Sequence, residues 1–328
     1  MCRACLFILA NWLTEGIGSI KKGLIYGVIT YTIWGFLPIF WKLLEGIDSL
    51  ELLVYRIIWS FLVMSLTCLC FFKKEMFVEQ LLVVWRDAKV RWNLCLAALS
   101  IGGNWGAFIY CVASGQTNNA SFAYFCSPLF TVFFGHFLFK ERLNVWQRFA
   151  VVLLMGSIFT KLFTGASLSF VPLLMALAVA YYGVLEKQGV LNPIFRMWVE
   201  TVILLPVALM IMWFTKMPLV LPMLGGNLLL VTSGAATALP LILFMAASKR
   251  LPQTVLAILQ YLNPALMLAI SVFLFREPWH PSDLVTYSWV LVGSIIFVIG
   301  LMKHTKEEEK HDKRRSSIDS VSDYQHRR

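Results

Sequence analysis

The chain contains one short stretch twice: Phe137-Leu138-Phe139-Lys140-Glu141 returns, 136 residues later, as Phe273-Leu274-Phe275-Arg276-Glu277. The same offset aligns three further pairs, Pro128 with Pro264, Ser127 with Asn263, and Tyr124 with Gln260. Chance similarity between two apolar segments is the competing explanation, because such segments always share Leu, Phe and Ala. The matched prolines and the shared basic-acidic ending favour an internal repeat.

The chain around this repeat is apolar over most of its length. Hydrophobic residues make up 59% of it and charged residues only 14%, whereas a soluble domain carries roughly 25% charged residues. The charges cluster between apolar runs of about 20 residues, the length that crosses a bilayer as a helix. We therefore expect an all-α membrane protein of ten transmembrane helices, at residues 23–42, 53–72, 92–113, 119–139, 145–163, 168–185, 197–214, 226–247, 253–275 and 283–302. Misassignment of a marginal run, or of Cys5–Leu13, changes the count to nine or eleven.

The repeat offset divides these helices into two inverted five-helix repeats, at residues 23–163 and 168–302. An odd number of spans per repeat places the two halves in the membrane with opposite orientation. Such inverted repeats are a hallmark of secondary transporters, in which the two halves exchange conformations to open a site to each side in turn. A cytoplasmic leader at 1–22 and a charged, disordered cytoplasmic tail at 303–328 complete the expected organisation.

Most lysine and arginine residues fall on one side of the predicted membrane body, and Lys42, Lys161, Lys216 and Arg276 fall on the other. The positive-inside rule then predicts a multi-pass protein of the cell inner membrane with both termini cytoplasmic. The formal net charge of +10 does not indicate nucleic acid as a partner, because the basic residues lie at helix ends and in the tail. Membrane lipid and a small-molecule substrate are the expected partners, and the oligomeric state stays open.

The two repeated prolines mark the first candidate site residues. Pro128 and Pro264 each remove one backbone hydrogen bond and so free the carbonyls of Tyr124 and Gln260. Free backbone groups at membrane depth are tolerated where they are buried in protein or line a wet cavity. Ser127 and Asn263 lie beside the prolines and add polar side chains at the same depth. Kinks that serve only helix packing are the alternative interpretation.

Aromatic and amide side chains on the first and third spans extend this set. The first span carries Tyr31 and Trp34 on one face, and the third contains Asn104 and Trp105 after Gly102-Gly103, whose small size permits close helix approach. Such a face suits flat or cationic ligands through stacking and cation–π contact. For any single tryptophan, an interfacial anchor or a core filler is the competing interpretation.

Charged residues within the spans are few, which makes them informative. Arg56 lies inside the second span with Trp59 one turn later, and Glu200 lies inside the seventh. Because the halves are inverted, Arg56 and Glu200 fall near opposite membrane surfaces and are not expected to pair. We expect gate or helix-anchoring roles, with a structural salt bridge or snorkelling to headgroups as the alternative for each.

Enzyme chemistry has little support in the sequence. It contains no His/Asp/Glu cluster, no HxxxH and no Walker-type phosphate loop, so we expect no catalytic residues, cofactor or metal. Two rival classes to transport remain: a membrane enzyme, and a membrane-embedded receptor or scaffold without transport activity.

Several motifs also match a known group of proteins. They are WG at 34–35, YRIIWS at 55–60, IGGNW at 101–105, YFCSPL at 124–129, KERL at 140–143, ET at 200–201, LLPV at 204–207, QY at 260–261 and Pro264. With them the chain resembles RarD-type proteins of the EamA family, in the drug/metabolite transporter superfamily. The resemblance implies ten helices in two inverted repeats, with a central cavity lined mainly by the first four helices of each. It also implies a small substrate that is amino-acid- or nucleoside-derived, or drug-like.

Overall fold

A computed structural model describes residues 19–139, 144–163, 170–218, 224–251, 253–300 and 302–303. Within these ranges all regular structure is helical, which confirms the all-α prediction. The first repeat contains α2 (Ser19–Lys42), α3 (Ser49–Phe71), α4 (Lys74–Arg86), α5 (Ala88–Ala113), α6 (Thr117–Phe139) and α7 (Val145–Phe163). The second contains α8 (Phe170–Lys187), α9 (Pro193–Thr215), α10 (Leu224–Ser248), α11 (Gln253–Leu259), α12 (Leu262–Ala269), the π-helix η1 (Ile270–Leu274) and a final helix at Pro281–Gly300.

Helix therefore occupies each of the ten predicted ranges. Among the described residues, seven helices are by themselves long and apolar enough to cross a membrane. The ten-span count stays a prediction, because α6, α7 and the ninth range, which is divided among α11, α12 and η1, are not among these seven. Most of the predicted leader, and the tail beyond Lys303, lie outside the described residues.

Several helices begin about four residues before the predicted ranges, because their first turns are polar. Asp48 accepts a hydrogen bond from the Leu50 amide at the start of α3, and Asn192 accepts one from the Ile194 amide at the start of α9. Side-chain oxygens at these positions satisfy amides that have no partner within the helix. A search for apolar runs alone misses such turns.

The helix α4 was not expected, since its residues were assigned to a connecting loop between two spans. None of its side chains is buried, and its apolar residues Leu81 and Trp85 are exposed beside basic Lys74 and Arg86. This mixture is typical of a helix that lies in the plane of the membrane interface.

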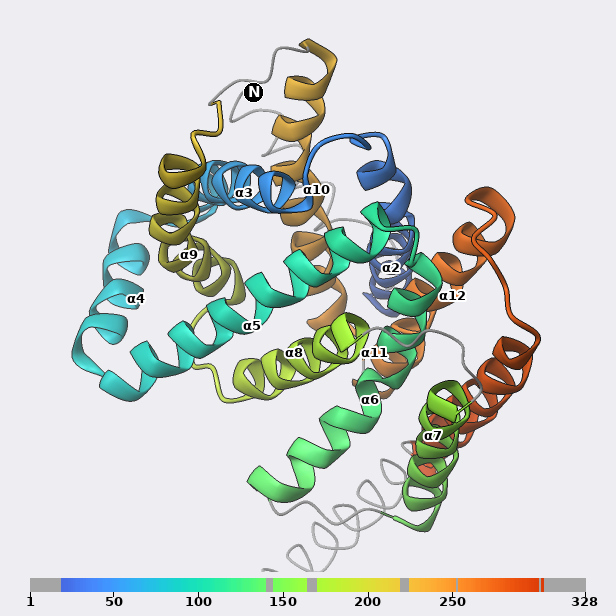
Figure 1. Ribbon diagram of the computed structural model, residues 1–328. Coiled ribbons are helices and arrows are strands. Elements are labelled where there is room, and N and C mark those ends of the chain that lie inside the picture. Colours follow the sequence, from blue (N-terminus) through green and yellow to red (C-terminus); the bar gives the residue numbers. More distant parts are fainter. Residues whose placement is uncertain are drawn as a thin grey trace, which may run out of the picture. The chain divides into compact units, whose positions relative to one another are not determined.

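The helices pair across the two repeats in a symmetric pattern (Figure 1). The third predicted span of one repeat packs on the first of the other, as α5 on α8 and as α10 on α2. The second spans, α3 and α9, pack on each other, and in the fourth position α6 packs on α12. Exchanging the repeats leaves this pattern unchanged, as a two-fold relation between similar halves requires.

Glycines set some of the closest approaches. A Cβ at Gly234 of α10 would collide with the backbone carbonyl of Trp59 in α3, so this crossing requires glycine. A Cβ added at Gly102 of α5 would lie 3.0 Å from the side chain of Leu204 in α9, whereas one added at Gly103 would have no neighbour within 4 Å. Of the two glycines predicted to permit close packing, Gly102 is therefore the one that does.

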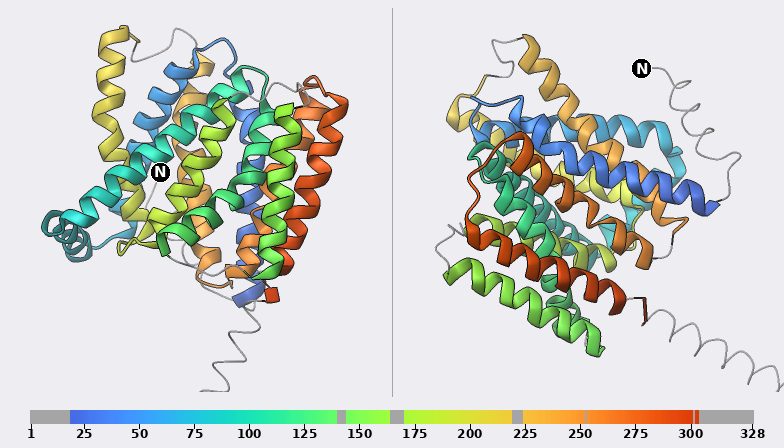
Figure 2. Two further views of the ribbon diagram at one scale, coloured as in Figure 1. Left: turned by 60° about the horizontal axis from the view of Figure 1, so that its bottom comes forward. Right: turned by 90° about the vertical axis from the view of Figure 1, so that its right-hand side faces the viewer.

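The chain divides into two compact units, and the first contains α2 to α6 and α8 to η1. The second unit contains α7 and the final helix, which lie side by side in both views of Figure 2. Within it, Gly293 lies against Leu154, and Lys161 forms an ion pair with Asp283 at 3.4 Å. Lys161 is only 1% exposed, so this ion pair is buried.

Candidate functional site

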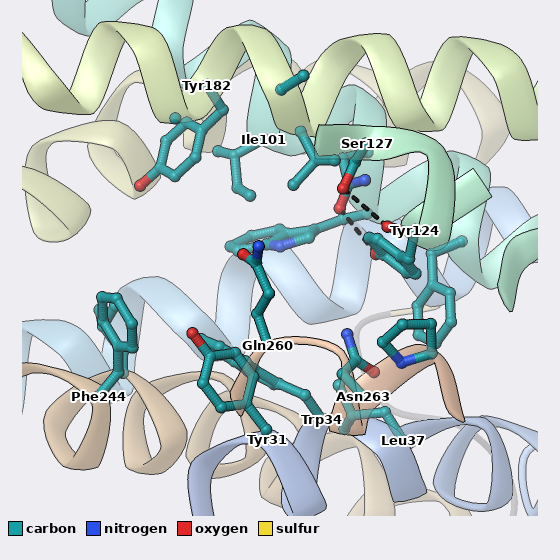
Figure 3. A pocket seen from close by; sticks show the side chains of 18 of the residues that line it. Tyr31, Trp34, Leu37, Ile101, Tyr124, Ser127, Tyr182, Phe244, Gln260 and Asn263 are labelled. Carbon is teal, nitrogen blue, oxygen red and sulfur yellow. Dashed lines mark hydrogen bonds between the residues drawn. The ribbon is translucent and has the colours of Figure 1, made fainter. Parts of the chain in front are cut away.

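The first unit encloses a cavity of about 420 Å³, within the roughly 300–1,000 Å³ range of small-molecule sites. Its lining comes from α2, α3, α5 and α6 of the first repeat and from α8, α9, α10 and residues 260–267 of the second. These elements correspond to the first four predicted spans of each repeat, as the family resemblance implies. Figure 3 shows Tyr31, Trp34 and Asn263 on one side of the cavity, facing Tyr182 and Tyr124 on the other.

Most of the predicted path residues line this one cavity. They are Tyr31, Trp34, Arg56, Asn104, Trp105, Tyr124, Ser127, Gln260, Asn263 and Pro264. Three others lie outside the lining. Pro128 is buried within α6, Trp59 packs in the apolar core, and Glu200 is fully buried beneath Tyr182.

The carbonyls freed by the two prolines both have hydrogen-bond partners. The hydroxyl of Ser127 donates to the Tyr124 carbonyl at 2.8 Å, and the Asn263 amide donates to the Gln260 carbonyl at 3.3 Å. A further bond joins the two proline helices, since Ser121 Oγ donates to the Pro264 carbonyl at 2.8 Å. The packing and cavity interpretations of the prolines are thus compatible, because these bonds lie at the cavity wall.

Asn104 links three helices at the cavity. Its Nδ2 donates to the Met175 carbonyl of α8 at 3.2 Å, and its Oδ1 accepts a bond from the Tyr124 hydroxyl of α6 at 3.2 Å. A buried side-chain amide with both ends bonded rigidifies its surroundings. Asn104 therefore positions Tyr124 and is itself part of the lining.

Aromatic rings make up much of the wall. The rings of Tyr31 and Trp34 meet edge to face at 5.5 Å between centroids, and Phe244 of α10 lies 6.3 and 6.0 Å from them. On the other wall, Phe108 and Tyr124 form a similar edge-to-face pair at 6.1 Å. Such walls accept flat apolar groups, and the tyrosine hydroxyls and the indole N–H add a few polar groups at their edges.

Arg56 lies close to two indole rings. Its guanidinium carbon is 4.3 Å from the ring centroid of Trp105 and 5.2 Å from that of Trp41. The residue is 5% exposed, and its Nε and Nη1 are buried without a hydrogen-bond partner. An unsatisfied buried donor costs about 1–3 kcal/mol, and more when it carries charge. The cation is therefore only partly compensated, by the two rings.

Glu200 belongs to a different cluster. Its Oε1 accepts a hydrogen bond from Arg196 Nε at 2.8 Å, and its Oε2 accepts one from the Tyr182 hydroxyl at 3.1 Å. The salt-bridge alternative thus holds for Glu200. Arg196 falls one residue before the predicted seventh span, whereas in the structure it lies inside α9 and is 2% exposed. Its spacing of four residues from Glu200 is the helical ion-pair signal that could have revealed it.

Sequence reasoning missed other lining residues, notably Glu186, Tyr182 and Phe244. The predicted sixth span ended at residue 185, whereas α8 continues to Lys187 and brings Glu186 onto the cavity wall. A carboxylate at the end of an apolar run was the available signal. For Phe244 no signal distinguished it from the other aromatic residues of its span.

Comparisons with known proteins agree on one group. Residues 21–162 and 167–299 each match the model of the EamA-like transporter family. The chain is 33% identical over 299 residues to the uncharacterized transporter YojE of Bacillus subtilis, covering 89% of this chain and 98% of that protein. It is 32% identical over 283 residues to protein RarD of Salmonella typhi, covering 85% and 95%. The predicted resemblance to RarD-type proteins is thereby confirmed.

One solved crystal structure is also similar. It aligns with a TM-score of 0.57 over 85% of this chain and 98% of its own, at 16% sequence identity. At that identity the likeness shows the fold alone.

Proposed function

The chain belongs to the EamA-like transporter family, and from this premise we propose that it is a secondary transporter that works by alternating access. Its cargo is a small metabolite, amino-acid- or nucleoside-derived or drug-like, which it moves across the inner membrane. Membership in a transporter family and seven apolar helices make it a multi-pass membrane protein.

One observation carries the proposal: helices of both repeats, corresponding to the first four predicted spans of each, line one cavity. A site between two similar halves is what alternating access needs, because movement of one half against the other opens it to each side in turn. In this scheme the five-helix repeats span 23–163 and 168–302 with opposite orientation, and both termini are cytoplasmic.

The proposed substrate path follows the cavity wall. Arg56, Asn104, Tyr124, Gln260 and Asn263 are the residues that we assign to it first, because each lines the cavity and carries a polar group. Most of the remaining predicted residues are aromatic and would enclose the apolar part of the cargo.

Uptake of a pooled metabolite set into proteoliposomes tests the proposal, with and without an imposed proton gradient. We expect accumulation of one class of compound, chemically unchanged, and its response to the gradient decides between proton coupling and exchange. No flux of any compound by folded protein would overturn the proposal and favour a receptor or scaffold. Conversion of a compound would favour an enzyme.

Two glycines offer a matched pair of variants for this assay. Gly183 lines the cavity and has open space around an added Cβ, so Gly183→Leu should fill the cavity and abolish uptake. Gly103 has the same open space but is outside the lining, so Gly103→Leu should leave uptake within about twofold of wild type, as exposed substitutions change little. Equal uptake by both variants would show that cargo does not pass through this cavity.

A further inference from the structure

Arg56 has no counter-ion in the protein as described. Within the ranges that the structure covers, no carboxylate forms an ion pair with its guanidinium. A guanidinium keeps its charge in proteins, and a lone cation inside a membrane is costly enough that it marks a functional site. The charge of Arg56 is therefore left without a carboxylate partner among the described residues.

The guanidinium of Arg56 is packed against two indole rings and has two buried donors without a partner. Trp105 and Trp41 lie over the guanidinium at 4.3 and 5.2 Å. Nε and Nη1 are donors without partners, and the residue is part of the cavity lining. A planar guanidinium held in this way presents parallel N–H groups that match the two oxygens of a carboxylate or phosphate.

The rest of the lining describes the remainder of the ligand. Tyr31, Trp34 and Phe244 form an aromatic group that accepts a flat apolar body. Glu186 also lines the cavity and would repel a second negative charge. The ligand that fits has one anionic group and an aromatic or similarly flat body.

We propose that this cavity binds an organic anion, a carboxylate or phosphate monoester with a flat apolar body, whose anionic group pairs with Arg56. The proposal rests on the proposed function and deepens it, since it names the substrate class of the same cavity. Binding also explains the two tryptophans: they hold the guanidinium in the plane that the anion requires while the site is empty.

Binding to the purified full-length protein in detergent tests the proposal without relying on transport. The probes are indole-3-acetate, indole-3-acetamide and tryptamine, with phenyl phosphate, phenylacetate and phenylacetamide as a second series. The readouts are the shift in melting temperature and the dissociation constant. We expect each anion to bind at least about tenfold more tightly than its neutral or cationic analogue, because charge-assisted bonds are roughly twice as strong.

Variants of Arg56 test whether this residue causes the preference for anions. Arg56→Gln should remove it, leaving the anion and the amide with similar affinity. Arg250→Gln is the matched control, since Arg250, in the turn after α10, bonds the Ala246 carbonyl, lies over Tyr26 and is outside the lining; it should keep the preference. If Arg56→Gln does not fold, Arg56→Lys retains charge without the planar fork, and should weaken anion binding while still rejecting tryptamine.

The proposal is overturned if tryptamine binds as tightly as indole-3-acetate, if no anion of either series binds folded wild-type protein, or if Arg56→Gln keeps the preference. Proteoliposome flux separates this result from the proposed function. Flux of neutral or cationic metabolites alone would support transport and reject the anion site. Arg56-dependent anion binding without any flux would support the site and reject transport.

Discussion

The two proline helices of the molecule, α6 and α11–α12, differ although they share a repeat position. In α6 the helix runs without interruption from Thr117 to Phe139 through Pro128. In the second repeat, Gln260 and Tyr261 interrupt the helix before Pro264, and a π-helix follows from Ile270. The proline therefore does not decide by itself whether its helix breaks.

The residue before the proline explains part of the difference. Ser127 folds its hydroxyl back onto the carbonyl that Pro128 leaves without an amide donor. Asn263 stands at that position in the second repeat, and its Oδ1 is buried without a hydrogen-bond partner. Its backbone amide instead bonds the Gln260 carbonyl three residues back, which tightens the chain locally. The serine thus stands in the continuous helix and the asparagine just after the interruption.

The end of the second proline helix contacts the start of the first. Glu277, the last residue of the repeated motif, accepts bonds from the amides of Thr117 and Asn118, both at 2.8 Å. Ser271 Oγ also donates to its Oε2 at 2.8 Å. The second repeat thus holds the start of the first repeat's proline helix. Glu141, the counterpart of Glu277, lies outside the described residues.

Among the variants of the two proline helices, Pro264→Ala should change the uptake rate most. A proline in a helix interior costs about 3 kcal/mol, so its removal favours fusion of α11 and α12 and stiffens the wall at Gln260. We expect the initial uptake rate per unit of protein to fall at least about tenfold. Pro128→Ala should reduce it less, because α6 is already continuous. Equal loss of abundance in both variants, measured by immunoblot, would assign both prolines to packing.

Glu277→Gln should have the next largest effect. The amide keeps one acceptor oxygen but replaces the other with a donor that faces the amides of α6, and the favourable charge at the helix start is lost. We expect about 2 kcal/mol less free energy of unfolding, measured by thermal melting in detergent. Glu45→Gln is the control, since Glu45 pairs with Lys42 at an exposed position. An equal loss of free energy of unfolding in this variant would show that the bonds of Glu277 to the start of α6 add no particular stability.

Ser127→Ala should have a smaller effect. It leaves the Tyr124 carbonyl without its hydroxyl partner, at a cost of about 1 kcal/mol. The melting temperature should fall by a few degrees for a protein of this size. Ser100→Ala removes a hydroxyl that bonds a carbonyl of an uninterrupted helix at an exposed position and should change little. An equal decrease in melting temperature in the two variants would show that the Ser127 hydroxyl stabilises no more than a serine hydroxyl in a helix without proline.

Asn263→Ser should have the smallest effect on stability. It removes a buried acceptor without a partner and supplies the hydroxyl that α6 uses, so we expect the free energy of unfolding to rise by about 0.5–1 kcal/mol. Uptake should change in the same direction as in Pro264→Ala, though less. A lower free energy of unfolding would mean that Asn263 makes a stabilising contribution not explained by its hydrogen bonds.

The sequence predicted the helical fold and the repeats well because both depend on long apolar runs and on the matched prolines. Most of the path residues chosen from the sequence also line one cavity, since the repeat aligns Tyr124 with Gln260 and Ser127 with Asn263. Sequence reasoning failed where short-range polar contacts decide: Arg196 and Glu186 lie inside helices whose ends are polar. The two proline helices also satisfy the carbonyl freed by proline differently, with the Ser127 hydroxyl in α6 and with the Asn263 backbone amide at Gln260. Apolar periodicity carries no information on such bonds and could not predict the interruption at Gln260.

Side-specific labelling of the cavity tests the central claim, alternating access through this site, most directly. Thr131 lines the cavity, so Thr131→Cys in a variant without the seven native cysteines gives a single reporter. Phe273→Cys, at an 81% exposed position that we expect to face lipid, is the control. We predict that a membrane-impermeant thiol reagent labels Cys at 131 from each side of oriented proteoliposomes, and that a transported compound slows both reactions. Labelling from one side only, or no effect of the compound, would contradict the account.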